Sequence, residues 1–448
     1  MIYTEQKALG EPSALRAEIG KVRDAAIAMA ALGAPRKNEA LKAIARSLLD
    51  NIDIIAKTNA LDVEKAQKDG LPSQIIKRLQ MDGKKVEAVA EGLSDLVELP
   101  DPVGRQLMAT ELDDGFILRK VACPIGVIGV IFESRPDALV QIAGLCLKSG
   151  NAVILKGGSE ASNSNRLLAE LIKEASAGAG LPGDWICRLE TRAQINEILK
   201  MDEEIDLLIP RGSNSFVKYI MDNTRIPVLG HSEGLCHCYV DSAADVGLAV
   251  KVAVDSKTQY VAVCNAAETL LVHKDVAEAF LPAFRAGLAG AARASGAPAT
   301  AVRGCEKTRR ILRDCGVEPA TDEDWRTEYL DYIISVKIME SLDEAIDHIN
   351  RYGSRHTDAI VTGDAAAAGE FMLRVDSANV FHNCSTRFSD GFRYGFGAEV
   401  GVSTSKIHAR GPVGLDGLVT YKYLLSGNGN IVADYEGGER KFTHKPLI

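Results

Sequence analysis

The sequence predicts an α/β protein with doubly wound parallel sheets, in which helices cover both faces of each sheet. Residues 126–132 and 152–155 are nearly continuous apolar runs, typical of strands that are buried on both faces. Residues 137–147, between them, have a helical pattern, so the three segments form a βαβ unit. At about 150 residues per domain, a chain of 448 residues has room for two or three domains.

The first half of the chain contains further elements in a consistent order. Residues 14–99 are charged and alanine-rich with apolar side chains at helical spacing, which predicts a layer of helices. Residues 108–121 hold two short extended runs around Asp-Asp-Gly, which predicts a β-hairpin. A helix near residues 165–175 and a strand near residues 185–189 continue the alternation.

The second half begins another α/β unit after residue 233. Helices are expected at residues 274–291 and 342–351. Glycine-containing turns between residues 381 and 414 predict long irregular loops, and such loops often carry function. Residues 417–424 are again strand-like.

The composition excludes several classes of protein. Lys and Arg total 52 against 61 Asp and Glu, a formal charge of -9, so no overall basic character favours nucleic acid or an anionic membrane as partner. The apolar stretch at residues 121–132 is shorter than the roughly 20 residues of a membrane helix, and no secretory signal is visible. Nine irregularly spaced cysteines indicate reduced thiols. We expect a cytoplasmic protein.

Cys264 is the candidate nucleophile. It follows an apolar run and precedes Asn-Ala and then Leu-Leu-Val, which predicts a thiol on a turn at the mouth of a sheet. A thiolate attacks carbonyl carbon readily and also leaves readily. Because a single cysteine is most often a small buried hydrophobic residue, the assignment depends on the surrounding segments.

Two segments could bind phosphate groups. After the strand at residues 152–155 come Lys156, two glycines and Ser159, a cation and a hydroxyl suited to a phosphate, although Lys156 could equally be an ordinary solvated lysine. Gly212 and Ser213 precede a helical segment whose N-terminus could hold a pyrophosphate or simply be capped. Residues 178–183 match G-x-G-x-x-G but connect a helix to a strand, so we predict a turn there.

Five segments in one order resemble the aldehyde dehydrogenase superfamily, most closely its gamma-glutamyl phosphate reductase (glutamate-5-semialdehyde dehydrogenase) branch. They are residues 124–136, 151–159, 212–214, 255–273 and 382–414. The resemblance implies two doubly wound α/β domains and a small β oligomerisation arm. The implied NADPH-binding domain spans residues 1–104 and 121–232, the catalytic domain residues 233–414, and the arm residues 105–120 and 415–448. An exposed arm edge favours pairing of subunits into a dimer or tetramer.

The resemblance also implies the reaction. Cys264 would displace phosphate from L-glutamate 5-phosphate to form a thioester, which NADPH would reduce to L-glutamate 5-semialdehyde in the second step of proline biosynthesis. The backbone N–H of Cys264, with the Asn265 side chain, is the nearest oxyanion donor. We expect the acyl phosphate to come from a separate glutamate 5-kinase, and leave open whether the two proteins touch.

Cofactor roles follow from the same resemblance. Lys156 and Ser159 would hold the adenosine ribose and its 2′-phosphate, which favours NADPH, whereas Glu160 could accept from a ribose hydroxyl. Gly212 and Ser213 would lie at the pyrophosphate. Glu328 would hold the nicotinamide ribose.

Substrate binding is expected to involve arginines. Arg135 stands where oxidising aldehyde dehydrogenases have their oxyanion asparagine, and could bind the acyl phosphate or a carboxylate or form a structural salt bridge. Oxidising aldehyde dehydrogenases have a water-activating glutamate near the position of His231. An enzyme without that glutamate would not hydrolyse its own thioester. Four further residues, Arg387, Ser403, Thr404 and Arg410, are candidates for holding the α-carboxylate of the substrate, and Asn383 could orient the substrate. The branch usually has Arg-Pro where this chain has Tyr260-Val261, so no role for that arginine carries over.

Other functions were weighed against this one. An oxidising NAD-dependent aldehyde dehydrogenase would need a base near Cys264, such as Glu233 or Glu268. A noncatalytic scaffold could retain the fold without the reaction. The triplet at residues 236–238, Cys-His-Cys, looks metal-like, but neighbouring strand residues alternate faces and cannot converge on one ion, so we expect no metal.

Overall fold

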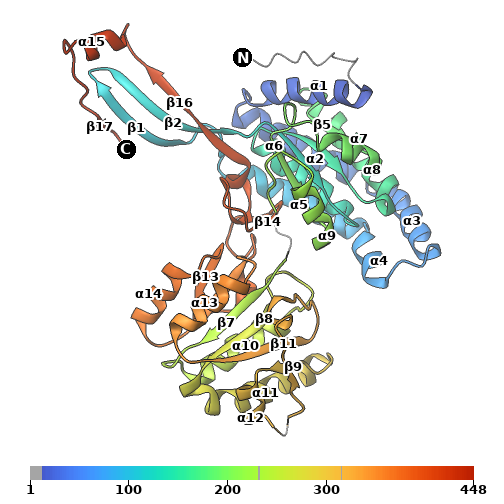
Figure 1. Ribbon diagram of the computed structural model, residues 1–448. Coiled ribbons are helices and arrows are strands. Elements are labelled where there is room, and N and C mark those ends of the chain that lie inside the picture. Colours follow the sequence, from blue (N-terminus) through green and yellow to red (C-terminus); the bar gives the residue numbers. More distant parts are fainter. Residues whose placement is uncertain (1–12, 231–232, 314) are drawn as a thin grey trace, which may run out of the picture. The chain divides into compact units, whose positions relative to one another are not determined.

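The computed structural model describes residues 13–230, 233–313 and 315–448, and their contacts divide the chain into two units (Figure 1). Unit 1 consists of Met1–Leu229, Gly397–Gly401 and Val413–Ile448, and unit 2 of Gly230–Phe396 and Val402–Pro412. Each unit contains a parallel sheet flanked by helices. The doubly wound α/β fold predicted from the sequence is therefore confirmed.

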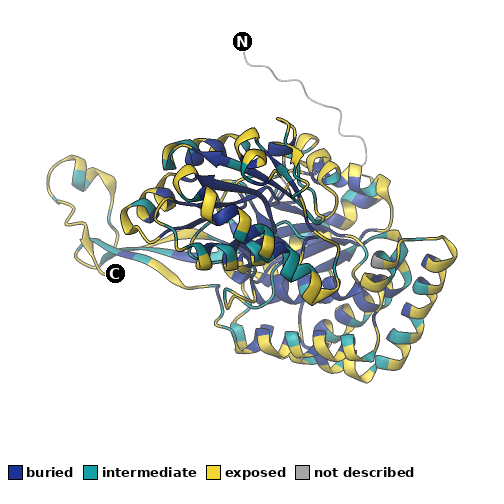
Figure 2. Ribbon diagram, turned by 90° about the horizontal axis from the view of Figure 1, so that it is seen from below, coloured by how far each residue is buried: buried dark blue, intermediate teal, exposed yellow. Residues whose placement is uncertain are grey.

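The sheet of unit 1 has four parallel strands in the order β5-β4-β3-β6. They are β3 (Val127–Ile131), β4 (Ala152–Lys156), β5 (Ile186–Arg188) and β6 (Leu207–Pro210). β3, β4 and β6 are buried along their whole length, because helices cover both faces (Figure 2). The continuous apolar runs in the sequence reflect this burial.

The helices of unit 1 form the predicted helical layer and the crossovers of the sheet. They are α1 (Ala14–Met29), α2 (Ala34–Asp50), α3 (Ile52–Lys68), α4 (Ser73–Leu79), α5 (Gly83–Glu98), α6 (Pro136–Lys148), α7 (Ser162–Gly178), α8 (Arg192–Ile198) and α9 (Asn214–Asp222). α6 is buried on nearly all sides because α2, α5 and α7 pack around it. After α7, Gly180 takes a positive φ of 87° on the way to β5, so the G-x-G-x-x-G match is the predicted turn.

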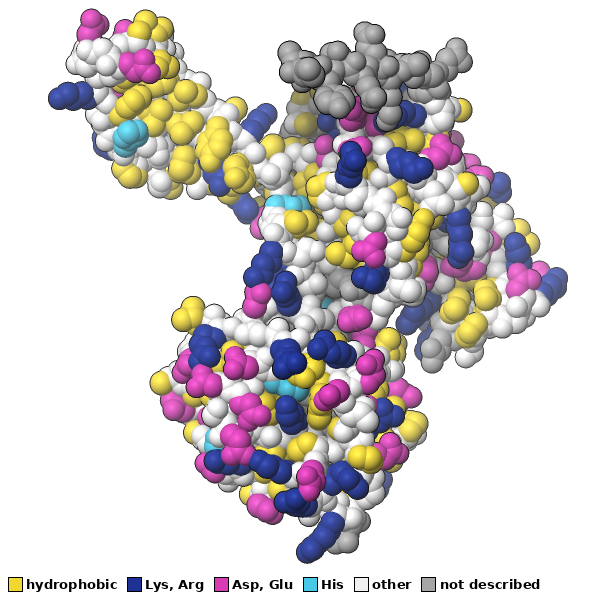
Figure 3. Space-filling view, viewed as in Figure 1, with side chains coloured by type: hydrophobic (Ala, Val, Ile, Leu, Met, Phe, Trp, Pro, Cys, Tyr) yellow, Lys and Arg dark blue, Asp and Glu magenta, His cyan; other side chains and the backbone are white. Residues whose placement is uncertain are grey.

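The arm of unit 1 is a four-stranded antiparallel sheet in the order β16-β2-β1-β17. Its strands are β1 (Gln106–Asp113), β2 (Phe116–Pro124), β16 (Val419–Ser426) and β17 (Lys445–Pro446), and α15 (Val432–Glu436) lies between the last two. The predicted hairpin and the predicted strand near residues 417–424 are both confirmed. β16 is an edge strand, and hydrophobic side chains lie exposed on the arm (Figure 3), among them Tyr421, Tyr423, Leu424 and Leu425.

The sheet of unit 2 has seven parallel strands in the order β10-β9-β11-β8-β7-β12-β13. They are β7 (Cys236–Val240), β8 (Ala267–His273), β9 (Ala301–Gly304), β10 (Glu318–Pro319), β11 (Ile333–Met339), β12 (Thr357–Val361) and β13 (Asn379–His382). Two short strands, β14 (Gly401–Ser403) and β15 (Gly411–Val413), pair separately.

Helices cover both faces of this second sheet. They are α10 (Val246–Thr258), α11 (Lys274–Ser295), α12 (Glu306–Ile311), α13 (Leu342–Tyr352) and α14 (Ala365–Arg374). Cys238 and Val240 pack against α10 and α11, whereas Tyr239 packs against α13 and α14. Neighbouring residues of β7 thus enter different cores, as strand alternation requires. No helix in the described ranges is both long and apolar enough to span a membrane.

Two helical glycines give a matched test of the packing around α6. A Cβ at Gly144 would lie 2.5 Å from Leu93 Cδ2 and 3.1 Å from Leu96 Cδ1, whereas a Cβ at Gly92 would meet nothing within 4 Å. We expect Gly144→Val to lower the free energy of unfolding by about 1–3 kcal/mol through overpacking. Gly92→Val should change it by less than about 0.5 kcal/mol. Urea denaturation of both variants would check this, and equal losses would contradict it.

Candidate active site

Cys264 lies on a turn between α10 and β8, residues 259–266, which we call the thiol turn. The side chain is half-buried, and neither its thiol nor its backbone N–H hydrogen bonds to any described part of the chain. Its carbonyl oxygen accepts from Cys236 Sγ at 3.2 Å. A Cβ on Gly234 would lie 2.5 Å from Cys264 Cα, so only glycine allows this close approach. The turn therefore presents a thiol and an N–H donor that are both available to a ligand.

A buried ion pair closes the base of the thiol turn. Lys257 Nζ, in the last turn of α10, lies 2.6 Å from Glu268 Oε2 on β8, and neither side chain is exposed by more than 1%. Glu268 Oε1 accepts from the backbone N–H of Leu330 at 3.2 Å. Burial raises the pKa of Glu268 to about 7, although Lys257 opposes the shift. A carboxylate enclosed in this way cannot reach a solvent water, which argues against Glu268 as the base of an oxidising enzyme.

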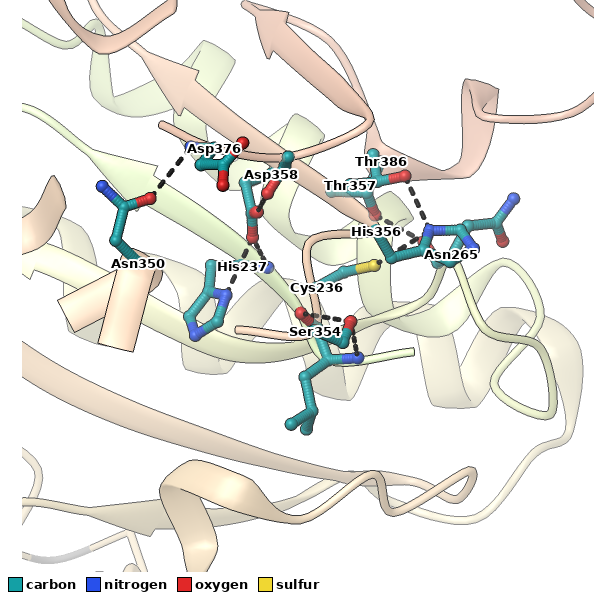
Figure 4. A network of polar contacts seen from close by, with 12 residues as sticks. Cys236, His237, Asn265, Asn350, Ser354, His356, Thr357, Asp358, Asp376 and Thr386 are labelled. Atoms are coloured by element: carbon teal, nitrogen blue, oxygen red, sulfur yellow. Dashed lines mark hydrogen bonds and ion pairs between the residues drawn. The ribbon is translucent and has the colours of Figure 1, made fainter. Parts of the chain in front are cut away.

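A loop from the distant C-terminal part of unit 2 binds the thiol turn on the side of Asn265. This loop, residues 385–389, is called the arginine loop because Arg387 lies at its centre. Asn265 Nδ2 donates to the carbonyl oxygen of Ser389 at 2.7 Å. Thr386 Oγ1 donates to the Asn265 carbonyl at 2.7 Å, and both of these residues are labelled in Figure 4. The Asn265 amide thus holds the loop, and the backbone N–H of Cys264 is the free donor beside the thiol.

Arg387 is held beside the thiol turn in a buried position. Its Nε donates to Gln259 Oε1 at 3.0 Å. The residue as a whole is only 8% exposed. Burial lowers the pKa of Arg387, the neighbouring charge of Arg393 adds to the effect, and the Cys264 thiol opposes it. Cys264, Asn265 and Arg387 are therefore brought together by the fold.

The other predicted substrate residues of unit 2 have partners of their own. Asn383 has a positive φ of 56° and pairs through both ends of its amide with the backbone of Thr362. Arg410 donates to the side chain of Asp376 at 3.2 Å and to its carbonyl at 2.9 Å. Both side chains order strand ends and loops in this structure.

Three further candidates are placed as follows. Ser403 is fully buried, and its Oγ accepts from the N–H of Ser405 at 3.3 Å. Thr404 donates its backbone N–H to the carbonyl of Gly230 at 3.3 Å. Glu328 lies close enough to Glu268 for its charge to contribute to the raised pKa there.

The side chains of the Cys-His-Cys triplet diverge. Cys236 Sγ contacts the Cys264 carbonyl, His237 Nδ1 lies 2.8 Å from Asp358 Oδ1 (Figure 4), and Cys238 packs into the core. Over the described ranges, no group of His, Cys, Asp and Glu is arranged to hold a metal ion. The motif contributes structure instead.

In unit 1, a cavity of about 240 Å³ lies at the end of β4, and we call it the β4 cavity. Residues that line it include Lys65, Gly157, Ser159, Asn165, Arg188 and Glu190. Asn165 is only 3% exposed, and its Oδ1 has no hydrogen-bond partner in the described chain. A Cβ on Gly157 would lie 2.1 Å from Asn165 Nδ2. Only a glycine backbone leaves this edge of the cavity open.

Two of the three charged side chains that line the β4 cavity, Lys65 and Arg188, are basic, and the third is Glu190. Lys156, next to it, donates to the Gly157 carbonyl, and burial lowers its pKa while Glu160 opposes the shift. Arg188 forms an ion pair with Glu190. Two cationic side chains, a hydroxyl and an unused amide oxygen fit the phosphate-bearing ribose of a dinucleotide.

The remaining predicted residues of unit 1 do not line the β4 cavity. Arg135 Nη2 pairs with Asp137 Oδ2 at 2.7 Å at the start of α6, the structural alternative left open by the sequence. Ser213 occupies the N-cap position of α9, and its hydroxyl lies 3.3 Å from that of Ser215. A Cβ on Gly212 would lie 3.2 Å from the carboxyl carbon of Glu133. His231 lies outside the described residues.

Sequence reasoning missed Arg188, Lys65, Asn165, Gln259 and the Lys257–Glu268 pair. Arg188 could have been found, because it ends the strand next to β4, in register with Leu155. Ligands of open parallel sheets bind at the carboxyl ends of neighbouring strands. Lys257 and Glu268 stand on either side of the cysteine turn, but no sequence pattern shows that they meet.

Removing one partner of the buried pair should be far more harmful than removing both. We expect Lys257→Met to lower the free energy of unfolding by about 3–5 kcal/mol, because it leaves Glu268 buried without a counter-charge. The double variant Lys257→Met with Glu268→Leu should recover most of that loss. Denaturant unfolding of both variants checks the coupling, and strictly additive effects would contradict it.

Comparison with known proteins identifies the family. The sequence matches the model of the aldehyde dehydrogenase family over residues 5–300. It is 60% identical over 427 residues to gamma-glutamyl phosphate reductase from Pelotomaculum thermopropionicum, covering 95% of this chain and 96% of that protein. The crystal structure of gamma-glutamyl phosphate reductase from Thermotoga maritima has a TM-score of 0.89 at 40% identity, covering 93% of this chain and 99% of that one.

A more distant structure shares the fold alone. The acetylating aldehyde dehydrogenase from Geobacillus thermoglucosidasius is 16% identical, with a TM-score of 0.61 over 93% of this chain and 97% of that one. The same architecture is thus retained at low identity. The thiol turn, the two parallel sheets and the matches along almost the whole sequence agree: the chain belongs to the aldehyde dehydrogenase family and groups within it with the gamma-glutamyl phosphate reductases.

Proposed function

We propose that this protein catalyses the NADPH-dependent reduction of L-glutamate 5-phosphate to L-glutamate 5-semialdehyde and phosphate, the second step of proline biosynthesis, in the cytoplasm. The observation that carries the proposal is the Cys264 thiol, which is unbonded and partly exposed on a turn fixed by a buried ion pair. The names of relatives that match nearly the full length support it.

In the first stage the Cys264 sulfur attacks the γ-acyl carbon. The sulfur–carbon bond forms and the carbon–oxygen bond to phosphate breaks, while the electron pair and the thiol proton leave with hydrogen phosphate. Negative charge develops on the acyl oxygen, and the free backbone N–H of Cys264 is suited to receive it. Forming a thioester first replaces one difficult reduction by two easier steps.

In the second stage the thioester on Cys264 is reduced. Bound NADPH supplies the hydride for this reduction. Cys264 retains the acyl group during the reduction. When the thiohemiacetal collapses, the carbon–sulfur bond breaks, the sulfur leaves as the thiolate, and it regains a proton from solvent. Because Glu268 is enclosed and paired, it does not activate water against the thioester.

The cofactor is proposed to bind chiefly through unit 1, the NADPH-binding domain, with unit 2 as the catalytic domain. Lys156, Ser159 and Arg188 would hold the 2′-phosphate of the adenosine ribose, and Asn165 Oδ1 would accept from a ribose hydroxyl. Gly212 and Ser213, at the start of α9, would hold the pyrophosphate, and Glu328 the nicotinamide ribose. The cationic lining of the β4 cavity favours NADPH over NADH.

Partners follow from the arm and the substrate. The exposed hydrophobic residues and the open edge of β16 favour pairing with the arm of a second subunit, giving a homo-oligomer. Arg135, Asn383 and Arg410 are kept as further proposed substrate contacts, although each side chain also has a partner within the chain. A separate glutamate 5-kinase is proposed as the source of the acyl phosphate. A transient contact between this kinase and the present protein is part of the same proposal.

Replacing Cys264 should abolish turnover. The reverse reaction, reduction of NADP by glutamate 5-semialdehyde, should require phosphate in the parent enzyme, and Cys264→Ala should lower its rate at least roughly a thousandfold. Cys315→Ala, at another partly buried thiol of unit 2, is the control and should keep the parent rate. Turnover without phosphate would instead support the oxidising aldehyde dehydrogenase.

Replacing Arg188 should weaken recognition of the 2′-phosphate. Arg188→Gln is expected to weaken binding of 2′,5′-ADP about tenfold, the loss of one charged hydrogen bond, and to leave binding of 5′-AMP unchanged. Arg46→Gln removes an exposed guanidinium of α2 and serves as the control. Calorimetric titration measures both ligands, and equal weakening for the two would contradict the assignment.

A further inference from the structure

Arg387 is a buried cation that lacks an anionic partner. It is 8% exposed, and within the described chain its only side-chain hydrogen bond runs from Nε to the neutral amide oxygen of Gln259. Its two terminal nitrogens have no hydrogen-bond partner among the described residues, and they reach solvent, because neither is one of the fully buried unbonded atoms. Burial and the charge of Arg393 lower the pKa of Arg387 and outweigh Asp390 and Asp255, which raise it. Burying a charge without a partner is costly, so such a residue points to a ligand that brings the opposite charge.

The loop that carries Arg387 is fixed on both sides of this residue. Thr386 and Ser389, which flank it, both hydrogen bond to Asn265 on the thiol turn. Arg393 Nη1 donates to the carbonyl oxygen of Arg387 at 2.7 Å, which fixes its backbone. Because Nε is occupied by Gln259, the free fork of two nitrogens has a set direction, as bidentate recognition of an oxyanion requires.

The position of this fork selects between the two anions of the proposed substrate. Gln259, which holds Arg387, begins the thiol turn, and Asn265, which holds the arginine loop, follows Cys264 directly. In L-glutamate 5-phosphate the phosphorus is one oxygen away from the carbon that the sulfur attacks. The α-carboxylate is separated from that carbon by three others. An anion bound beside the sulfur is therefore the phosphate.

We infer that Arg387, oriented by Gln259, binds the phosphate group of the acyl phosphate, and inorganic phosphate in the reverse reaction. This inference rests on the proposed function and revises the expectation that Arg387 holds the α-carboxylate. As the carbon–oxygen bond breaks, the electron pair stays on the departing phosphate oxygen, where the guanidinium neutralises it. Arg387 is thus a catalytic residue, and Gln259 is a positioning residue.

A binding experiment tests the site without turnover. Alkylation of Cys264 by iodoacetamide is followed by mass spectrometry in increasing concentrations of inorganic phosphate. Phosphate should slow alkylation of the parent, and Arg387→Gln should need at least about tenfold more phosphate for the same protection. Arg351→Gln, an exposed arginine of α13, is the matched control and should behave as the parent. Absence of protection in the parent, or equal protection in Arg387→Gln, would overturn the inference.

A kinetic experiment distinguishes the two anions. In the phosphate-dependent oxidation of semialdehyde, Arg387→Lys and Gln259→Leu should raise the KM for phosphate several-fold and leave the KM for semialdehyde within about twofold. The opposite split would assign Arg387 to the α-carboxylate and overturn the inference. If the parent shows no phosphate-dependent turnover but phosphate still protects its Cys264, the proposed function fails while the phosphate site is supported.

Discussion

The ion pair between Lys257 and Glu268 is the constraint on which the catalytic side of this protein depends. It joins the end of a helix to the start of a strand at 2.6 Å, and so closes the turn that carries Cys264. Both groups are removed from water, where an ion pair is only tolerated if it is well aligned. The bond from Leu330 N–H to Glu268 extends the same anchor to the segment of Glu328. Because Lys257 and Glu268 hold the two ends of the turn together, the Cys264 thiol between them keeps its position without hydrogen bonds of its own.

Much of the architecture could be predicted because it depends on local patterns. The strands β3 and β4 are recognisable from unbroken apolar runs, and the hairpin from Asp-Asp-Gly between two extended segments. Cys264 was assigned to a turn for a similar reason. The match of residues 178–183 to a nucleotide motif was correctly dismissed, because the order of helix and strand around it is reversed.

What could not be predicted depends on contacts between distant residues. Asn265 was expected to donate to an oxyanion, yet its amide binds the carbonyl of Ser389, more than a hundred residues along the chain. Arg387 could be suspected as a substrate residue, but its burial and its bond to Gln259 appear only in the folded chain. At the two positions where the resemblance leads one to expect Arg-Pro, Val261 is buried and Tyr260 is 49% exposed.

The pairing of β16 with β2 has a consequence for the timing of biosynthesis. Val419 lies opposite Pro124, so β2 waits for its neighbour until residues 419–426 have been synthesised. The βαβ core of unit 1 draws on segments that emerge much earlier. Nascent chains would therefore fold their first core while the arm is still an unfinished hairpin, and the edge that β16 presents exists only after β16 itself has been synthesised.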